Sequence, residues 1–358
     1  MNFVFRVDAS PVIGTGHIMR SWALAEAALE RGHPCHLLYN ECPQPLLDRW
    51  QMLGVAHTQV DGISGTLAEA KATARVAKEL EADWVILDGH HFGEGYQRTL
   101  LDLDIRFTAI DDYGHCLQNR ASIIINQNAS ACEAWYEGLG SQQKLLLGFD
   151  YTILRSQFRE LPRKPFDRSR PQNVLVTTGG TDPSDASLHI VRCLTKIETS
   201  KPITLRIIIG SLHPNKRRLD FLSEELRRNH SPIKLETASN VEDMPTMMDW
   251  ADIAIVGAGT TLYELYQRSI PALVITLVNN QISNALAAIN RWKTSLDGGR
   301  IESLENGPLI DNFNRLMTDP DLRQILSEKC SQLVDGNGVY RVIETIEAYQ
   351  PSEVMARS

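Results

Sequence analysis

The feature that most constrains this chain is a regular alternation of short β-rich runs with helical stretches. The run 3–8 (FVFRVD) precedes a helical stretch over about 17–31, and the run 35–39 (CHLLY) follows it. Further strand-like runs in this half are 84–88, 105–110 and 122–126. This rhythm is typical of a parallel β-sheet covered by helices, so the sequence predicts the α/β class.

The same rhythm restarts after a charged, proline-bearing segment at about 158–172, which has no hydrophobic periodicity and is typical of a linker. A chain of 358 residues is long enough for two domains. We therefore predict an N-terminal Rossmann-like domain over 1–160, a C-terminal Rossmann-like domain over 172–335, and a closing helix and tail over 336–358. Open α/β sheets bind ligands at the carboxyl ends of their strands, so we expect a site in a central cleft that both sheets face.

Composition and charge exclude several classes of partner. The formal net charge of -8 argues against non-specific binding to nucleic acid or to an anionic membrane. Neither a signal peptide nor a run of about 18 apolar residues occurs, so we expect a cytoplasmic protein. The six cysteines lack CxxC spacing, which indicates reduced, structural thiols. Because no coiled-coil pattern or long apolar stripe is present, we expect a monomer.

The loop after the first predicted strand contains the leading catalytic candidate. Asp8 ends that strand, Gly14 and Gly16 allow a tight turn, and His17 falls in the first turn of the next helix. Backbone amides at a helix start disfavour a protonated imidazole, so His17 is expected to be neutral and able to accept a proton. Arg20, three residues on, shares its face. The alternative is that His17 only caps the helix, and the absence of the third glycine of GxGxxG disfavours NAD.

Two glycine-rich junctions in the second half, TTGGTDPS and GAGTTLYEL, each precede a predicted helix and offer backbone amides to a phosphate. Together they suit a diphosphate without a metal, although glycine turns are common in any α/β fold. The candidate ligand-binding residues there are Gly179, Gly180, Thr181, Gly259, Thr260 and Thr261. Glu264 follows the second junction and could accept both hydroxyls of a ribose, or could be a solvated surface residue.

Three other strand ends carry polar side chains. Asn280 and Gln281 follow the run 272–277, where they either contact a ligand or, for Asn280, cap a helix. The runs DGHHF at 88–92 and DDYGH at 111–115 contain histidines and aspartates. Neither run has the His-x-x-x-His or Glu-x-x-His spacing that aims two ligands from one helix, so we predict no metal and no cofactor.

These motifs together resemble a known family. The stretch RVDASPVIGTGHIMRSWALAEAALERG, followed by LLGFDYTILRSQF, LVTTGGTDPS, GAGTTLYEL and NNQ, resembles the UDP-sugar hydrolases of the pseudaminic acid pathway and their spore-coat polysaccharide relatives. The resemblance covers nearly the whole chain in order and spacing. GTGHIMR with the later NQ is specific, whereas the glycine loops are shared with the wider GT-B glycosyltransferase superfamily.

The resemblance implies a GT-B fold and the metal-independent hydrolysis of UDP-2,4-diacetamido-2,4,6-trideoxy-β-L-altropyranose to UDP and free sugar. The family's essential histidine, nucleotide-binding glutamate, sugar-site asparagine and LR-x-x-F arginine fall on His17, Glu264, Asn280 and Arg155. Two positions depart from the family: His90 stands where a tyrosine is frequent, and Ser269 stands where a glycine is usual.

The implied reaction is an attack by water on the anomeric carbon, opposite UDP, with inversion. His17 would take the proton of that water, amides near Gly180 and Gly259 would stabilise the departing UDP, and Asp8 would orient His17 or bind a sugar hydroxyl. One alternative is a GT-B glycosyltransferase, in which an acceptor hydroxyl replaces water. Another is a nucleotide-sugar sensor or scaffold subunit without turnover.

Overall fold

A computed structural model of the chain describes residues 1–116, 118–163, 165–169, 171–180, 182, 184–197, 199, 201–210, 216–239 and 241–350. The chain forms two compact units. The N-terminal unit contains Met1–Ile13, His17–Ser156 and the segment that begins at Gly336, and the C-terminal unit contains Gly14–Gly16 and Gln157–Asp335. Among the described residues, no helix is both long and apolar enough to span a membrane.

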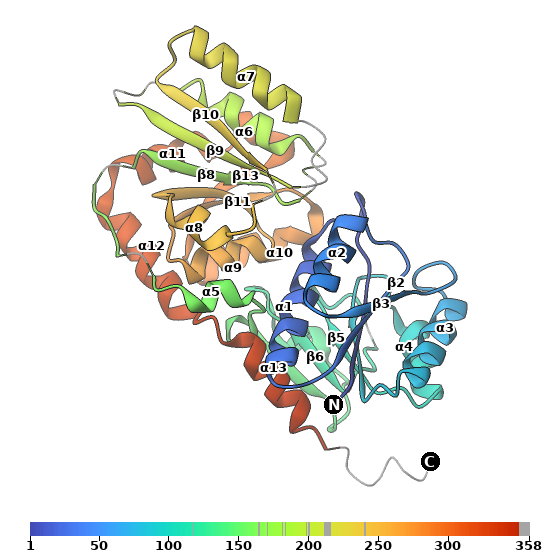
Figure 1. Cartoon of the computed structure of the whole chain (residues 1–358). Coiled ribbons are helices and arrows are strands. Elements are labelled where there is room, and N and C mark those ends of the chain that lie inside the picture. The colour runs from blue at the N-terminus through green and yellow to red at the C-terminus, as the bar shows by residue number, and fades with distance from the viewer. Residues whose placement is uncertain are drawn as a thin grey trace. The chain divides into compact units, whose positions relative to one another are not determined.

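The N-terminal unit is built on a seven-stranded parallel sheet with the order β3-β2-β1-β4-β5-β6-β7 (Figure 1). Its strands are β1 (Phe3–Val7), β2 (Cys35–Tyr39), β3 (Ala56–Gln59), β4 (Trp84–Asp88), β5 (Phe107–Ile110), β6 (Ile123–Asn126) and β7 (Lys144–Leu147). Its helices are α1 (Gly16–Glu30), α2 (Gln44–Met52), α3 (Leu67–Glu79), α4 (Glu94–Asp102) and α13 (Gly338–Glu347), and α5 (Ser156–Glu160) leads into the other unit. Short β3 and β7 were not predicted.

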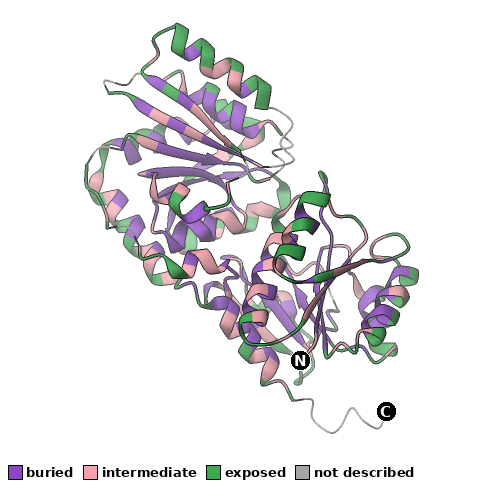
Figure 2. Cartoon of the chain, in the orientation of Figure 1, coloured by how far each residue is buried: buried purple, intermediate pink, exposed green. Residues whose placement is uncertain are grey.

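The two faces of this sheet bury separate apolar clusters. Phe3, Phe5 and Val7 of β1 pack with α1, α2 and α13 on one face, whereas Val4 packs with α3 and α4 on the other. Helix α13 returns from the end of the chain and buries Val339, Val342, Ile343 and Ile346, the positions whose helical spacing predicted a closing helix. Figure 2 shows the central strands buried, as expected for a sheet covered on both faces.

The C-terminal unit contains a six-stranded parallel sheet with the order β10-β9-β8-β11-β12-β13. Its strands are β8 (Asn173–Thr177), β9 (Ile203–Ile209), β10 (Ile233–Ser239), β11 (Ile253–Gly257), β12 (Ala272–Thr276) and β13 (Ser295–Arg300). Its helices are α6 (Ala186–Leu194), α7 (Lys216–Arg228), α8 (Met244–Asp249), α9 (Thr260–Gln267), α10 (Ile282–Leu286), α11 (Leu309–Thr318) and α12 (Pro320–Leu333). Strands β10 and β13 were not predicted.

The segment expected to be a linker is bonded to the C-terminal unit by two arginines. Arg268 donates to the carbonyl oxygens of Leu161 and Pro162 at 2.8 and 2.6 Å. Arg163 donates to the carbonyl oxygens of Gln267, Ser331 and Val334 at 2.6–2.9 Å. This part of the segment is therefore held on the unit by charged hydrogen bonds.

Ser269 occupies a backbone conformation that favours glycine. It directly follows the last turn of α9 and has φ +60°, in the left-handed region. Its hydroxyl is buried and has no hydrogen-bond partner among the described residues. Left-handed residues after a helix end are usually glycine, because a Cβ there costs about 1–2 kcal/mol. The glycine usual in the resembling family would therefore fit this turn better than serine.

Ser269→Gly is expected to raise the free energy of unfolding by about 1 kcal/mol, because it relieves the left-handed strain and removes an unpaired buried hydroxyl. Urea unfolding of the full chain measures this change. The matched control is Ser283→Gly on α10, an exposed helical serine where glycine costs about 0.5–1 kcal/mol. Loss of stability in both variants would contradict the assignment of strain to Ser269.

Candidate active site

Each sheet has a topological switch point, where the strand order reverses. In the N-terminal unit it lies between β1 and β4, and in the C-terminal unit between β8 and β11. Ligands of open α/β sheets bind beyond the carboxyl ends of the strands at such points. The loop with His17 follows β1 and the run DGHHF ends β4, while the glycine junctions follow β8 and β11. Both groups of sequence candidates therefore lie at switch points.

His17 and Asp88 form a dyad at the first switch point. His17 is the second residue of α1, and its Nδ1 lies 2.7 Å from Oδ1 of Asp88. The Asp88 side chain is fully buried, whereas that of His17 is 13% exposed. Burial would raise the pKa of Asp88, but the charge of Arg20 and the hydrogen bonds from Arg20 and His17 outweigh it and lower the pKa to about 2. An ionised carboxylate at this distance requires the proton on Nδ1, so Nε2 of a neutral His17 has a free lone pair.

Arg20 is a buried cation that joins the strand ends to α1. Its guanidinium donates to both oxygens of Asp88 at 2.6 and 2.8 Å and to Oδ1 of Asp112 at 2.6 Å. One of its nitrogens also lies 2.9 Å from Nδ1 of His17, as expected from their shared helix face. The two carboxylates raise the pKa of Arg20 against the opposing effect of burial, so the guanidinium is charged. This cation keeps both aspartates ionised.

Asp88, and not Asp8, orients His17. Asp8 accepts hydrogen bonds from Arg6 at 2.7 Å and from the amide of Asn40 at 2.6 Å, and its side chain is fully buried. Side chains alternate along a strand, so Asp8 shares the face of Arg6, which also pairs with Glu69 of α3 at 2.8 Å. Asp88 is in register with Val7, on the face that packs against α1. The expectation that Asp8 orients His17 was therefore wrong, because the strand pleat points the Asp8 side chain away from His17.

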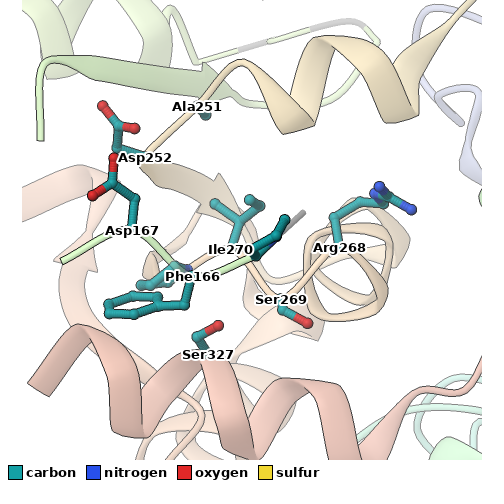
Figure 3. Close-up of a pocket in the computed structure, with 10 residues that line it drawn as sticks. Phe166, Asp167, Ala251, Asp252, Arg268, Ser269, Ile270 and Ser327 are labelled. Atoms are coloured by element: carbon teal, nitrogen blue, oxygen red, sulfur yellow. The ribbon is translucent and has the colours of Figure 1, made fainter. Parts of the chain in front are cut away.

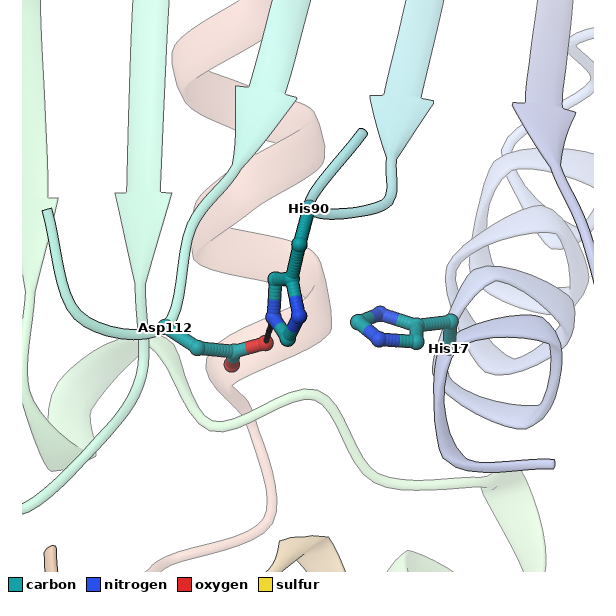
Figure 4. A group of neighbouring side chains, drawn as sticks. All are labelled: His17, His90 and Asp112. Atoms are coloured by element: carbon teal, nitrogen blue, oxygen red, sulfur yellow. Dashed lines mark hydrogen bonds and ion pairs between the residues drawn. The ribbon is translucent and has the colours of Figure 1, made fainter. Parts of the chain in front are cut away.

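Histidine–aspartate pairs recur along this edge of the sheet. Besides His17 with Asp88, the pairs are His90 with Asp112 at 2.9 Å, His91 with Asp8 at 3.1 Å, and His115 with Asp111 at 2.9 Å. Figure 4 shows the imidazole of His17 directed toward that of His90, with Asp112 on the other side of His90. The spacing of DGHHF and DDYGH alone did not reveal the first three pairs, because each joins residues from different segments, whereas His115 and Asp111 lie in one run.

One ring nitrogen of His17, one of His90 and a carboxylate oxygen of Asp112 lie within 4.8 Å of one another, a set that could hold a metal ion. The carboxylate of Asp112 already accepts hydrogen bonds from Arg20, His90 and Asn128. A guanidinium thus takes the place beside Asp112 that a metal cation would need. The donor set therefore fits a metal poorly.

The second glycine junction leaves a helix start open. Gly259 precedes α9, and among the residues that the structure describes no side chain caps this helix. Asn284 fixes the loop, because it donates to the carbonyl oxygen of Ala258 at 2.9 Å and accepts from the hydroxyl of Tyr263 at 2.8 Å. The Nε2 atom of Gln281 would lie 3.8 Å from a Cβ on Gly259, so its amide faces the junction. Asn284 supports this site and was not predicted.

The first glycine junction differs from the expectation. Gly179 has φ +89°, which the tight turn requires, and Gly180 follows it. The buried carboxylate of Asp182 accepts from the amides of Ala186 and Ser187 at 2.8 and 3.1 Å. An anion already occupies the start of α6, so the amides of Ala186 and Ser187 are not free for a phosphate, while the amides of Gly179 and Gly180 stay a prediction. Thr181 lies outside the described residues.

The remaining candidates have different environments. Glu264 on α9 and Arg155 just before α5 are each 9% exposed, so Glu264 is not a solvated surface residue. Asn280 is exposed in the turn Asn279–Gln281, and no side chain caps the following helix α10, which removes its expected alternative role. Thr260 and Thr261 open α9, and Gly16 opens α1.

Figure 3 shows a pocket in the C-terminal unit. Its lining includes Asp252 and Ile270, which precede β11 and β12. It therefore opens at the amino ends of these strands, the edge that α/β sheets do not use for ligands. Phe166 from the linker segment covers part of it.

Comparison with known proteins identifies relatives along nearly the whole chain. Residues 174–293 match the family model of the glycosyltransferase family 28 C-terminal domain. The spore coat polysaccharide biosynthesis protein SpsG of Bacillus subtilis is 23% identical over 348 residues, 95% of this chain and 96% of that protein. The UDP-2,4-diacetamido-2,4,6-trideoxy-beta-L-altropyranose hydrolase of Campylobacter jejuni is 24% identical over 291 residues, 80% of this chain and 95% of that protein. The relatives that the sequence motifs implied are thus found.

Solved structures show the same fold. MurG of Acinetobacter baumannii has a TM-score of 0.67 at 17% identity and covers 97% of this chain and 99% of its own. The Anabaena protein HepE, in complex with UDP and glucose, has a TM-score of 0.62 at 14% identity and covers 97% and 100%. With two parallel α/β sheets, these likenesses confirm the GT-B fold expected from the sequence.

The buried charges predict a specific dependence of stability on pH. The folded pKa of Asp88 lies at about 2, below its ordinary value of 3.8, so the ionised group stabilises the unit above pH ~4 and loses this effect toward pH ~2. Asp88→Asn leaves Arg20 with a single carboxylate and should cost about 3–5 kcal/mol at pH 7. In urea titrations the gap between wild type and variant should narrow from pH 4 to pH 2. A constant gap would contradict the ionised dyad.

Proposed function

We propose that the protein hydrolyses a UDP-linked 2,4-diacetamido-2,4,6-trideoxy sugar to UDP and free sugar, with inversion and without a metal. The observation that carries this proposal is the His17–Asp88 dyad, fixed by buried Arg20 at the switch point of the N-terminal sheet. A neutral imidazole with one nitrogen on a carboxylate is suited to take a proton through the other.

In the proposed reaction His17 is the general base. Nδ1–H donates to Asp88, so Nε2 accepts a proton from the attacking water, and the imidazolium that forms is stabilised by the ionised carboxylate. Arg20 limits this stabilisation, because its charge lies 2.9 Å from Nδ1. The imidazole of His17 therefore lies between one carboxylate and one guanidinium.

The leaving UDP is proposed to bind at the second glycine junction. The uncapped start of α9 presents amides and a partial positive charge to a diphosphate, whereas Asp182 already occupies the start of α6. Glu264 is proposed to accept the ribose hydroxyls, and Asn280 and Gln281 to contact the substrate beside the phosphates. Arg155, Thr260 and Thr261 are the further candidates for substrate contact, while Asp8 is reassigned to the support of the loop through Asn40.

The relatives support a role in polysaccharide or nonulosonic acid biosynthesis. The Campylobacter relative is named for hydrolysis of a UDP-linked diacetamido-trideoxy sugar, and the Bacillus relative for biosynthesis of spore coat polysaccharide. We infer that this chain acts on a UDP-sugar of the same class in such a pathway, as a protein of the cytoplasm. His90 stands at the position where a tyrosine is frequent in the resembling family. We infer that the sugar preference of this chain differs through this position.

A second candidate function is a GT-B glycosyltransferase with a UDP-sugar donor. It is favoured by the match of residues 174–293 to a glycosyltransferase domain and by the fold shared with MurG. Both functions need the same nucleotide site and a base, so the difference lies in the nucleophile.

The direct test is release of UDP with no acceptor present. Purified protein incubated with UDP-2,4-diacetamido-2,4,6-trideoxy-β-L-altropyranose and EDTA should release UDP and the free sugar over many turnovers. Phosphorus NMR follows the UDP, and proton NMR follows the anomeric configuration of the first product formed. Release only after an acceptor is added would contradict hydrolysis and establish the transferase instead.

The control is His17→Asn, which removes the base. It should lower turnover by about 10²-fold or more, because general-base catalysis contributes 10²–10⁴, while UDP affinity by calorimetry changes no more than a few-fold. A variant that retains most of its activity would contradict the role of His17. Loss of UDP binding by the same variant would show that His17 supports the nucleotide site.

A further inference from the structure

A second histidine faces His17 and is held in the same way. The rings of His17 and His90 are 4.8 Å apart and nearly perpendicular, at 85° (Figure 4). Nε2 of His90 lies 2.9 Å from Oδ2 of Asp112, as Nδ1 of His17 lies 2.7 Å from Oδ1 of Asp88. The two imidazoles therefore belong to two neighbouring dyads.

Both dyads depend on one guanidinium. Arg20 donates to Asp88 and to Asp112, and Asn128 donates to Asp112 at 3.0 Å. An ionised Asp112 requires the hydrogen on Nε2 of His90, so Nδ1 of the neutral ring keeps its lone pair. The side chain of His90 is 28% exposed, so a small molecule can reach part of its ring.

The ring of His90 is also fixed on its remaining sides. Tyr113 and His115 lie 5.0 and 5.5 Å from it, centroid to centroid, and both are in the loop after β5. Contacts with His17, Asp112 and these two rings leave His90 little freedom to turn. Because the ring is fixed, the lone pair on Nδ1 accepts a hydrogen bond from one direction only.

The free nitrogens of two facing rings can share one water molecule. A water that donates both its hydrogens at about 2.8 Å, with its H–O–H angle of about 105°, joins acceptors about 4.5 Å apart. The ring centroids of His17 and His90 are 4.8 Å apart, so the two rings are near enough to contact the same water. A water bound in this way directs its oxygen lone pairs away from both rings, where an electrophilic carbon could meet them.

We propose that His90 is a second catalytic residue, which accepts one hydrogen of the attacking water while His17 accepts the other. The water oxygen forms the bond to the anomeric carbon, the bond from that carbon to the UDP oxygen breaks, and the proton goes to Nε2 of His17. His90 keeps its own proton on Asp112 and gains none. This proposal rests on the hydrolytic function proposed above.

The test uses two amides that each imitate one nitrogen of the ring. In His90→Gln the amide reaches toward the position of Nε2 and keeps the contact with Asp112, but the Nδ1 acceptor is lost. In His90→Asn the amide oxygen stands near the position of Nδ1 and keeps the acceptor. We expect kcat for hydrolysis to fall about ten-fold or more in His90→Gln and less than about five-fold in His90→Asn, with KM within about three-fold in both.

Methanol provides a readout that a structural role would not change. It has a single O–H and donates to His17 alone, so its attack does not need His90. In mixtures of water and methanol, the ratio of methyl glycoside to free sugar should rise about five-fold or more in His90→Gln relative to wild type, and stay near the wild-type ratio in His90→Asn. Proton NMR measures both products.

The outcomes separate the two proposals. If the wild-type protein releases UDP only when an acceptor takes the sugar, the hydrolytic function and this proposal are overturned together. Wild-type hydrolysis with an unchanged product ratio in His90→Gln, or with a larger loss in His90→Asn than in His90→Gln, would overturn the role of His90 alone. Circular dichroism of both variants checks that the fold is kept. The test can be made with either variant that folds.

Discussion

The guanidinium of Arg20 is the interaction on which the candidate active site depends. It is buried, and a buried cation is tolerated only when carboxylates and hydrogen bonds replace its lost hydration. Asp88 and Asp112 supply these, and both are kept ionised in return. Each ionised aspartate then fixes the proton position of one histidine. A single helical residue thus sets the orientation and the free nitrogen of His17 and His90.

The parallel sheet explains why these groups meet. Asp88 ends β4, Asp112 follows β5, and α1 begins after β1, so all three arrive at one edge of the sheet. Strand order reverses between β1 and β4, which leaves room there for the start of α1. In the C-terminal sheet the same topology puts the glycine junction at the start of α9, with Asn284 holding the loop. The rule that ligands bind at switch points therefore accounts for two positions, that of the proposed base in the N-terminal unit and that of the proposed anion site in the C-terminal unit.

Much of the fold was predictable from the sequence, because apolar runs and helical spacing are local signals. The fold class, the main strands, the closing helix, His17 and its neighbour Arg20 follow from such signals. The partner of His17 could not be predicted in this way, because Asp8 is nearer in the sequence. Only the strand order and the alternation of side chains along the strands favour Asp88. Strands β3, β7, β10 and β13 were missed; each is only partly buried, and β3, β10 and β13 lack a continuous apolar run.

The capping of α6 by Asp182 also could not be predicted, because a carboxylate near a glycine turn can point either to the helix or to solvent. This cap moves the proposed diphosphate site to α9. The role of His90 depends on ring contacts among three loops, which the run DGHHF does not reveal. For His90 the missing information is which side chains from distant segments share one face.

The most direct measurement of the central claim is to run the reaction in water enriched in oxygen-18 and locate the label. Attack by water on the anomeric carbon puts the label in the free sugar and none in UDP, which mass spectrometry of both products detects. We expect label in the sugar alone, with inverted configuration at the first time points. Label in the terminal phosphate of UDP would show attack at phosphorus and would contradict the proposed mechanism.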